Sequence, residues 1–155
     1  MLQINIYTDG AARGNPGPGG YGVVLIANNH YKELSGGFRK TTNNRMELLA
    51  VIKALEAIKA VGASIQIYTD SKYVCDAITK GWVFNWQKIG FKDKKNADLW
   101  RQFLKLYPNF NLKLNWVKGH AGHIQNERCD VLATQAADDP TKLQIDAGFE
   151  SGLFN

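Results

Sequence analysis

Alternation of apolar and polar residues, together with short apolar runs, predicts five β-strands. Strict alternation over four to eight residues is the pattern of a strand with one buried face. The dipeptide Asn28-Asn29 suits a tight turn, so the first three strands are expected to form an antiparallel meander. The five predicted strands are residues 2–8, 21–27, 30–38, 64–69 and 111–117.

Helical spacing of apolar residues predicts helices between and after these strands. The first follows the polar residues 41–44, ends at Gly62 and has an apolar face that includes Leu48, Val51, Ile52, Leu55 and Ile58. Further helices are predicted over 71–79, 96–106 and 126–138, and the glycine- and proline-rich residues 10–20 are expected to form a loop. Because a helix precedes the fourth strand, that strand should lie parallel to the first. The fold class is therefore α/β (mixed α+β): a five-stranded mixed sheet, three antiparallel strands and then parallel ones, flanked by helices.

The length of 155 residues fits one domain, which we place at residues 1–140. Residues 141–155 look like a loose C-terminal tail, which the sequence allows to be disordered, docked or in contact with a partner. Neither a signal peptide nor a membrane-length apolar segment is visible, so a cytoplasmic protein is expected. Cys75 and Cys129 fall in helical patterns and are expected to be reduced packing residues rather than nucleophiles.

Four carboxylates are candidates for one catalytic centre. Asp9 and Asp70 each follow a strand ending in Tyr-Thr, and Glu47 and Asp130 lie near the starts of two predicted helices. The ends of neighbouring strands would hold two negative charges close together, which is costly unless a divalent cation neutralises them. Oxygen ligands without clustered His or Cys favour Mg²⁺ or Mn²⁺ over zinc. Two such ions roughly 3.5–4 Å apart would support phosphodiester cleavage.

Each acid also has an ordinary structural interpretation. Glu47 shares the apolar face of its helix, yet it could be a helix-start acid or a partner of Arg45. Asp130 could be a first-turn acid, and Asp9 and Asp70 could each cap a turn. Independent capping acids have no reason to converge at one end of a sheet, which favours the shared site. The net charge of +5 points to a polyanionic substrate, although a solvated basic surface without a partner would also explain it.

Several ordered motifs make the chain resemble bacterial type 1 ribonuclease H (the ribonuclease HI family) over residues 1 to about 140. They are Tyr7-Thr8-Asp9-Gly10, the glycine-rich residues 14–22, Thr41 to Leu48, Thr69-Asp70-Ser71, Trp116 to His123, and residues 126–130. The resemblance implies cleavage of the RNA strand of an RNA–DNA hybrid, giving 5′-phosphate and 3′-hydroxyl ends. It also implies that one or two Mg²⁺ ions, with Mn²⁺ as a substitute, are held by Asp9, Gly10, Glu47, Asp70 and Asp130.

The same resemblance assigns His120 to proton transfer or product release, while His123 could anchor its loop. Asn15, Asn43 and Asn44 match family positions that contact the 2′-hydroxyl group, the feature that distinguishes RNA from DNA. Thr42 and Asn85 match positions that hold a DNA phosphate, with Lys40 close by in sequence. Trp86 is expected to pack against a DNA sugar or the residues that support it.

Residues 80–105 carry seven basic and two acidic side chains and resemble the basic handle that grips the hybrid in this family. The stretch between Phe91 and Trp100 looks several residues short, so we expect a working but weaker handle. Trp82 and Trp100 are expected to lie in the core. The lysines predicted to contact substrate are Lys92, Lys94 and Lys95.

Other functions remain open at this point. A DNA endonuclease of the same fold fits the acids but not the residues that would contact the 2′-hydroxyl group. A hybrid-binding module without catalysis is disfavoured because all four acids are present, and a metal hydrolase with another substrate leaves the basic handle unexplained. We expect a monomer whose partner is the RNA–DNA hybrid and which has no membrane contact.

Overall fold

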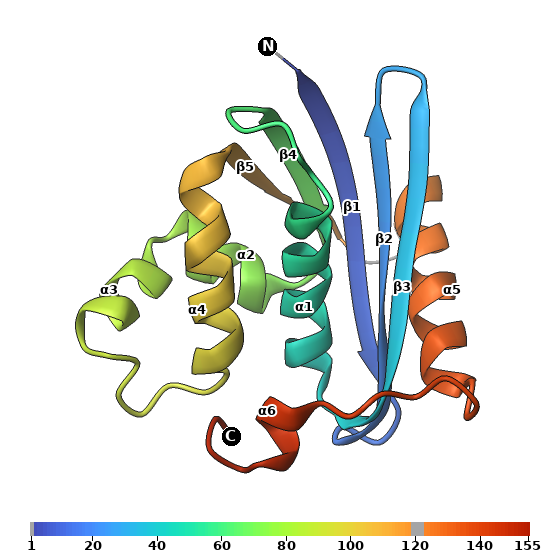
Figure 1. The fold of residues 1–155 in the computed structure, drawn as a ribbon, viewed down its shortest axis with the longest axis vertical. Coiled ribbons are helices and arrows are strands. Elements are labelled where there is room, and N and C mark those ends of the chain that lie inside the picture. The colour runs from blue at the N-terminus through green and yellow to red at the C-terminus, as the bar shows by residue number, and fades with distance from the viewer. Residues whose placement is uncertain (1, 119–122) are drawn as a thin grey trace.

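The computed structural model describes residues 2–118 and 123–155 and is built on a five-stranded sheet (Figure 1). The strand order is β3-β2-β1-β4-β5. β1, β2 and β3 pair antiparallel, whereas β4 and β5 run parallel to β1. The predicted meander and the parallel fourth strand are thus confirmed. The strands are β1 (Gln3–Ala12), β2 (Gly17–Ala27), β3 (His30–Thr41), β4 (Ser64–Thr69) and β5 (Asn111–Trp116).

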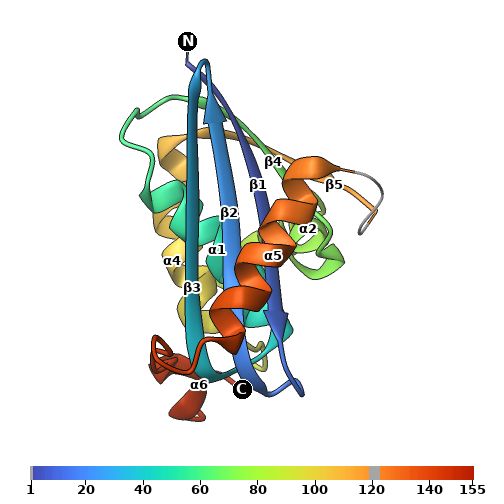
Figure 2. The same cartoon turned by 90° about the vertical axis from the view of Figure 1, so that its right-hand side faces the viewer.

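Helices cover both faces of the sheet. α1 (Asn43–Glu56) packs against β1 and β2 and also against α4 (Ala97–Leu106), while α5 (Ile124–Asp138) lies across the opposite face of β1, β2 and β3 (Figure 2). Within the described residues, none of the helices has the length and apolar content needed to span a bilayer. The remaining helices are α2 (Lys72–Thr79), α3 (Trp82–Lys88), α6 (Ala147–Glu150) and the 3₁₀ turn η1 (Tyr107–Asn109).

The start of α1 is fixed by its sequence. Thr42 adopts an extended conformation at the N-cap, and its hydroxyl oxygen accepts a hydrogen bond from the backbone N–H of Arg45. This bond satisfies one of the four amide donors that a helix start leaves without an intrahelical partner. Leu48 and Val51 on the helix are fully buried. The side chains of the first turn therefore have fixed positions relative to the sheet.

The prediction that residues 10–20 form a loop is wrong at both ends of the segment. β1 continues to Ala12 and β2 begins at Gly17, so a short connection remains between them. The glycines in these strands serve close packing, since a Cβ atom at Gly20 would collide with backbone atoms of α5, and one at Gly22 would do the same. Because glycine has no side chain, α5 can lie directly on the sheet at these two positions.

The C-terminal segment, which the sequence left open between three states, docks on the domain. Gln144 exchanges backbone hydrogen bonds with β3, donating to Gly37 and accepting from Arg39. The backbone carbonyl of Phe154 accepts a hydrogen bond of 2.8 Å from the N–H of Asn96. Figure 1 shows the segment, in red, below the start of α1. Residues 144–154 are therefore held against the same end of the domain at which α1 begins.

Candidate active site

The strand register places Asp9 and Asp70 side by side. Tyr7 of β1 is paired in parallel with Tyr68 of β4. Asp9 and Asp70 each lie two residues further along, at the carboxyl side of these adjacent strands. The sequence prediction that these two acids are neighbours is confirmed.

Glu47 reaches the same place from α1. Its position at the start of the second turn directs the carboxylate towards β1, and the α1 backbone approaches Gly10 so closely that a Cβ atom there would collide with the backbone of Glu47. The alternative that Glu47 pairs with Arg45 is wrong, because the guanidinium of Arg45 binds Asp98 and Asp146 instead. Gly10 thus contributes by permitting the close approach.

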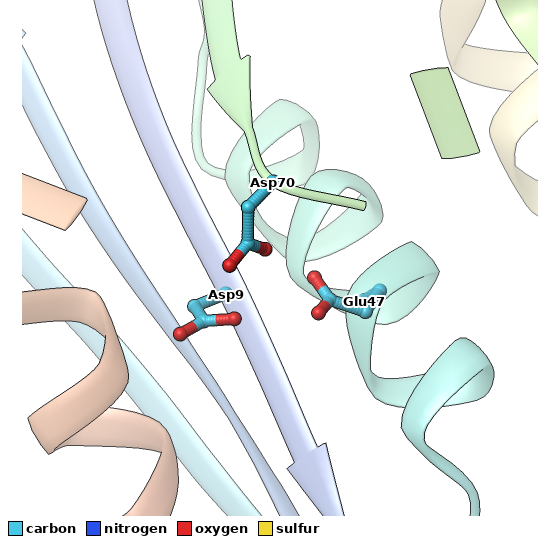
Figure 3. Close-up of side chains that lie close together, drawn as sticks. All are labelled: Asp9, Glu47 and Asp70. Atoms are coloured by element: carbon cyan, nitrogen blue, oxygen red, sulfur yellow. The ribbon is translucent and has the colours of Figure 1, made fainter. Parts of the chain in front are cut away.

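Three carboxylates converge from three elements, as Figure 3 shows. One oxygen each from Asp9, Glu47 and Asp70 can be chosen so that all three lie within 4.8 Å of one another. Asp9 is buried, and its Oδ1 accepts a hydrogen bond of 2.8 Å from the N–H of Gly10. This arrangement concentrates negative charge at a partly buried point.

The crowding changes the acidity of the cluster. Burial, followed by the negative charge of Asp70, raises the pKa of Asp9 to about 7, although the Gly10 hydrogen bond acts in the opposite direction. Burial also raises the pKa of Glu47 well above its ordinary value, with further contributions from Asp9 and Asp70. Without a counter-cation, the fully ionised cluster is therefore unfavourable at neutral pH.

The residues present fit a divalent cation. Oε2 of Glu47 is buried and has no hydrogen-bond partner among the described residues. A buried carboxylate oxygen without a partner carries a large desolvation penalty, which ligation of a cation would remove. All three groups are hard oxygen ligands, the type that Mg²⁺ and Mn²⁺ prefer.

Asp130 lies at the edge of this cluster. It belongs to α5 and lines the same hollow of about 430 Å³ as the other three acids. Its negative charge contributes to the raised pKa of Asp9. It is not a member of the tight group of three, so the structure brings the four predicted acids to one hollow but packs three of them closely.

The two histidines of the predicted loop have different outcomes. His120 lies outside the described residues, so its assigned role stays a prediction. His123 is exposed and occupies the N-cap position of α5 without a capping hydrogen bond from its side chain.

The predicted substrate-contacting amides gather beside the acids. Asn43 and Asn44 line the hollow that contains the acids. The side-chain oxygen of Asn15 accepts a hydrogen bond of 2.9 Å from the N–H of Asn43, and the side-chain oxygen of Asn43 accepts one of 2.6 Å from the N–H of Ala12. Asn15, Asn43, Asn44 and Thr42 also line a second hollow of about 510 Å³. The connection between β1 and β2 is thereby tied to the start of α1.

The predicted basic handle, residues 80–105, forms α3, the turn that follows it and most of α4. Trp86 of α3 packs edge-on against the buried Trp100, with ring centroids 5.9 Å apart, and Lys94 lies over the Trp86 ring. The core prediction is confirmed for Trp100, which is fully buried, and wrong for Trp82, which is 42% exposed. Of the substrate-contacting lysines predicted in this segment, Lys95 lines the second hollow. Asn85, Lys92 and Lys94 are exposed elsewhere on the segment, and Lys40 is exposed on β3.

Sequence reasoning missed several residues that line the two hollows. Lys72 lines the hollow of the acids, and its Nζ lies 4.5 Å from the centre of the Trp116 ring. Its position directly after Asp70-Ser71 in the sequence indicates that it lies close to the acids. Asn96, Phe149 and Asn155 line the second hollow. The last two belong to the C-terminal segment, for which the sequence offered no pattern.

Comparison with known proteins agrees with this geometry. The family model described as RNase H matches residues 1–138. The chain belongs to the RNase H family. A protein named Ribonuclease H from Desulforamulus reducens is 57% identical over 145 residues, covering 90% of this chain and 91% of the relative. One of the same name from Rippkaea orientalis is 52% identical over 154 residues, covering 96% and 93%.

Solved structures of RNase H proteins share the fold. LC9-RNase H1, a type 1 RNase H with the type 2 active-site motif, superposes with a TM-score of 0.80 at 31% identity, covering 99% of this chain and 82% of that one. LC11-RNase H1 in complex with an RNA/DNA hybrid gives a TM-score of 0.61 at 30% identity, with coverage of 87% and 96%.

Proposed function

We propose that this chain is an endoribonuclease that hydrolyses the RNA strand of RNA–DNA hybrids in a reaction that needs a divalent metal. The observation that carries the proposal is the convergence of Asp9, Glu47 and Asp70 in a chain that matches the RNase H family over residues 1–138. A structural neighbour in complex with an RNA/DNA hybrid supports the choice of substrate. Cleavage would leave 5′-phosphate and 3′-hydroxyl ends.

The acids would hold one or two Mg²⁺ ions, with Mn²⁺ as a substitute. When bound, such ions lower the pKa of a water molecule and stabilise negative charge on the leaving oxygen. Asp9, Glu47 and Asp70 supply the close oxygen ligands, and Asp130 completes the hollow from α5. Since these acids come from β1, α1, the end of β4 and α5, the folded domain fixes their spacing before any ion binds.

The amides beside the acids would identify the RNA strand. A side-chain amide can both donate to and accept from a 2′-hydroxyl group. Asn43 and Asn44 line the hollow of the acids, and Asn15 braces the backbone of Asn43. A substrate strand lying over the acids would therefore present its ribose to these amides.

The test is a cleavage assay on a hybrid of about 20 base pairs, roughly two helical turns, with both strands labelled. With Mg²⁺, we expect the RNA strand to be cut while the DNA strand and a duplex DNA of the same sequence stay intact. Asp70→Asn should abolish cleavage and still bind the hybrid. The matched control is Asp138→Asn, which changes an exposed acid paired with Arg13 and should cleave like the parent.

Other outcomes identify the competing functions. Cleavage of duplex DNA would indicate a DNA endonuclease. A parent protein that binds the hybrid but is inert with both Mg²⁺ and Mn²⁺ would be a binding module. A monomer in the cytoplasm remains the expectation for the active form.

A further inference from the structure

The C-terminal segment, residues 141–155, forms one wall of the second hollow. Phe149 and Asn155 line it from this segment. The amide nitrogen of the Asn155 side chain donates a hydrogen bond of 3.0 Å to the backbone carbonyl of Phe149, which ties the two lining residues together. The other lining residues come from the β1–β2 connection, the start of α1 and the turn of the basic handle that precedes α4. Four separate segments of the chain therefore enclose this hollow.

A buried ionic network holds the segment in place. Asp146 accepts hydrogen bonds from Arg45 at 2.8 and 2.9 Å and from the hydroxyl of Thr41 at 2.7 Å. Arg45 is 1% exposed and also binds Asp98. Because Arg45 directly follows Asn44, the network joins the C-terminal segment to the helix turn that carries the predicted substrate-contacting amides.

The lining of the second hollow suits a nucleic acid backbone. Among the described residues its lining has one cationic side chain, no carboxylate side chain and five side-chain amides, of which that of Asn96 is already bonded to Arg45 and Tyr73. Amides and a hydroxyl group offer hydrogen bonds to phosphate and sugar oxygens without sequence preference. The lining residues are Asn15, Pro16, Thr42, Asn43, Asn44, Lys95, Asn96, Phe149 and Asn155.

The position of the hollow selects the strand that it receives. Asn43 and Asn44 line both hollows, so the second one begins where the hollow of the acids ends. A hybrid whose RNA strand lies on the acids presents its minor groove to these amides. The strand on the far side of that groove is the DNA strand.

We propose that the C-terminal segment is part of the substrate-binding surface and that Phe149 and Asn155 contact the sugar–phosphate backbone of the DNA strand. The proposal rests on the proposed function, since it takes the RNA strand to lie at the acids. In this proposal the segment increases the affinity for the hybrid, in addition to packing against the domain.

The experiment changes the charge at two exposed positions of the same segment. Asn155→Asp places a negative charge in the wall of the hollow, whereas Leu153→Asp adds the same charge two residues away, where the side chain is 80% exposed and does not line the hollow. The dissociation constant for a labelled hybrid is measured by fluorescence anisotropy in the Asp70→Asn background at low salt. Melting temperatures of both variants establish that each is folded.

We expect Asn155→Asp to raise the dissociation constant by roughly three- to ten-fold, the effect of a unit charge about 4 Å from a phosphate in a mostly aqueous setting. Leu153→Asp should change it by less than about two-fold, since screening weakens more distant charges. Asn155→Lys should lower it and steepen the dependence of log affinity on log salt by about 0.9, the value for one added phosphate contact. Leu153→Lys should leave this slope unchanged.

The proposal would be overturned if the substitutions at positions 153 and 155 changed the dissociation constant equally, or if those at position 155 did not change it. The binding measurement does not depend on cleavage. A failure of the proposed function would instead show as a parent protein that binds the hybrid without cutting it.

Discussion

Replacing Asp9 by asparagine should stabilise the metal-free protein while it removes activity. The amide oxygen of asparagine can still accept the hydrogen bond from the N–H of Gly10, but the negative charge is lost. The change therefore removes the cost of burying an ionised carboxylate, and its repulsion from Asp70 and Asp130, with little change in shape.

The size of the effect follows from the pKa of Asp9, which rises from 3.8 to about 7 in the folded protein. A raised carboxyl pKa means that the folded state holds its proton more tightly than the unfolded state. Ionised Asp9 therefore destabilises the fold, and the penalty grows from about pH 4 to pH 7 and is constant above. Three pKa units correspond to about 4 kcal/mol at most, at 1.36 kcal/mol per unit.

Thermal unfolding in EDTA measures this penalty. At pH 8 we expect Asp9→Asn to be more stable than the parent by about 2–4 kcal/mol, which raises its melting temperature by roughly 4–16 °C. The range extends below the ceiling of about 4 kcal/mol because the neighbouring acids also carry part of the electrostatic cost. The gain should shrink at pH 5 and disappear below pH 4. Mg²⁺ should raise the melting temperature of the parent more than that of the variant, since binding to the folded state alone stabilises it.

The control is Asp138→Asn, which makes the same chemical change at an exposed acid whose pKa is held low by its hydrogen bond with Arg13. This variant should be slightly less stable than the parent at every pH above 4, and it should respond to Mg²⁺ as the parent does. If Asp9→Asn melts at or below the parent at pH 8 without metal, the electrostatic crowding inferred for the acids is wrong.

Three further perturbations test other parts of the structure. Asp146→Ala leaves buried Arg45 with Asp98 as its carboxylate partner, so calorimetry should show a loss of about 3 kcal/mol, whereas Glu150→Gln, which breaks an exposed pair with Arg39, should change little. Gly10→Ala should push α1, which carries Glu47, away from β1. A thermal-shift titration should therefore show weaker Mg²⁺ binding, and binding equal to that of the parent would contradict the close approach. Replacing Lys92, Lys94 and Lys95 of the handle together by alanine should raise the Michaelis constant and flatten its salt dependence, with the turnover number nearly intact. A large fall in the turnover number with an unchanged salt dependence would contradict this prediction.

Much of the fold could be predicted because its signals are local. Alternating apolar residues and short apolar runs indicated all five strands, although β1 and β2 extend further than predicted. The shared tripeptide Tyr-Thr-Asp placed Asp9 and Asp70 together once the connection between the two strands was recognised as a helical crossover. The apolar face of α1 likewise indicated that Glu47 points inward. These inferences need only the periodicity of one element and the parallel pairing of two.

The glycines of β1 and β2 show why some element boundaries could not be predicted. Glycine usually signals a turn, so residues 10–20 were expected to form a loop. Here Gly10 and Gly20 lie in strands where a helix backbone comes too close for a Cβ atom. That requirement comes from α1 and α5, which are distant in the sequence, and no local pattern reveals it.

The C-terminal segment shows the same limit at the binding surface. Asp146 lies among polar residues with no periodicity, and its partner Arg45 is 101 residues earlier in the chain. A single arginine of α1 could equally have paired with Glu47, two residues away, as the sequence allowed. The ionic pairing, and with it the wall formed by Phe149 and Asn155, depends on which carboxylates the folded domain brings to the buried guanidinium. Motifs can therefore indicate where bonds are broken, whereas the shape of the second hollow beside the acids depends on contacts between distant parts of the chain.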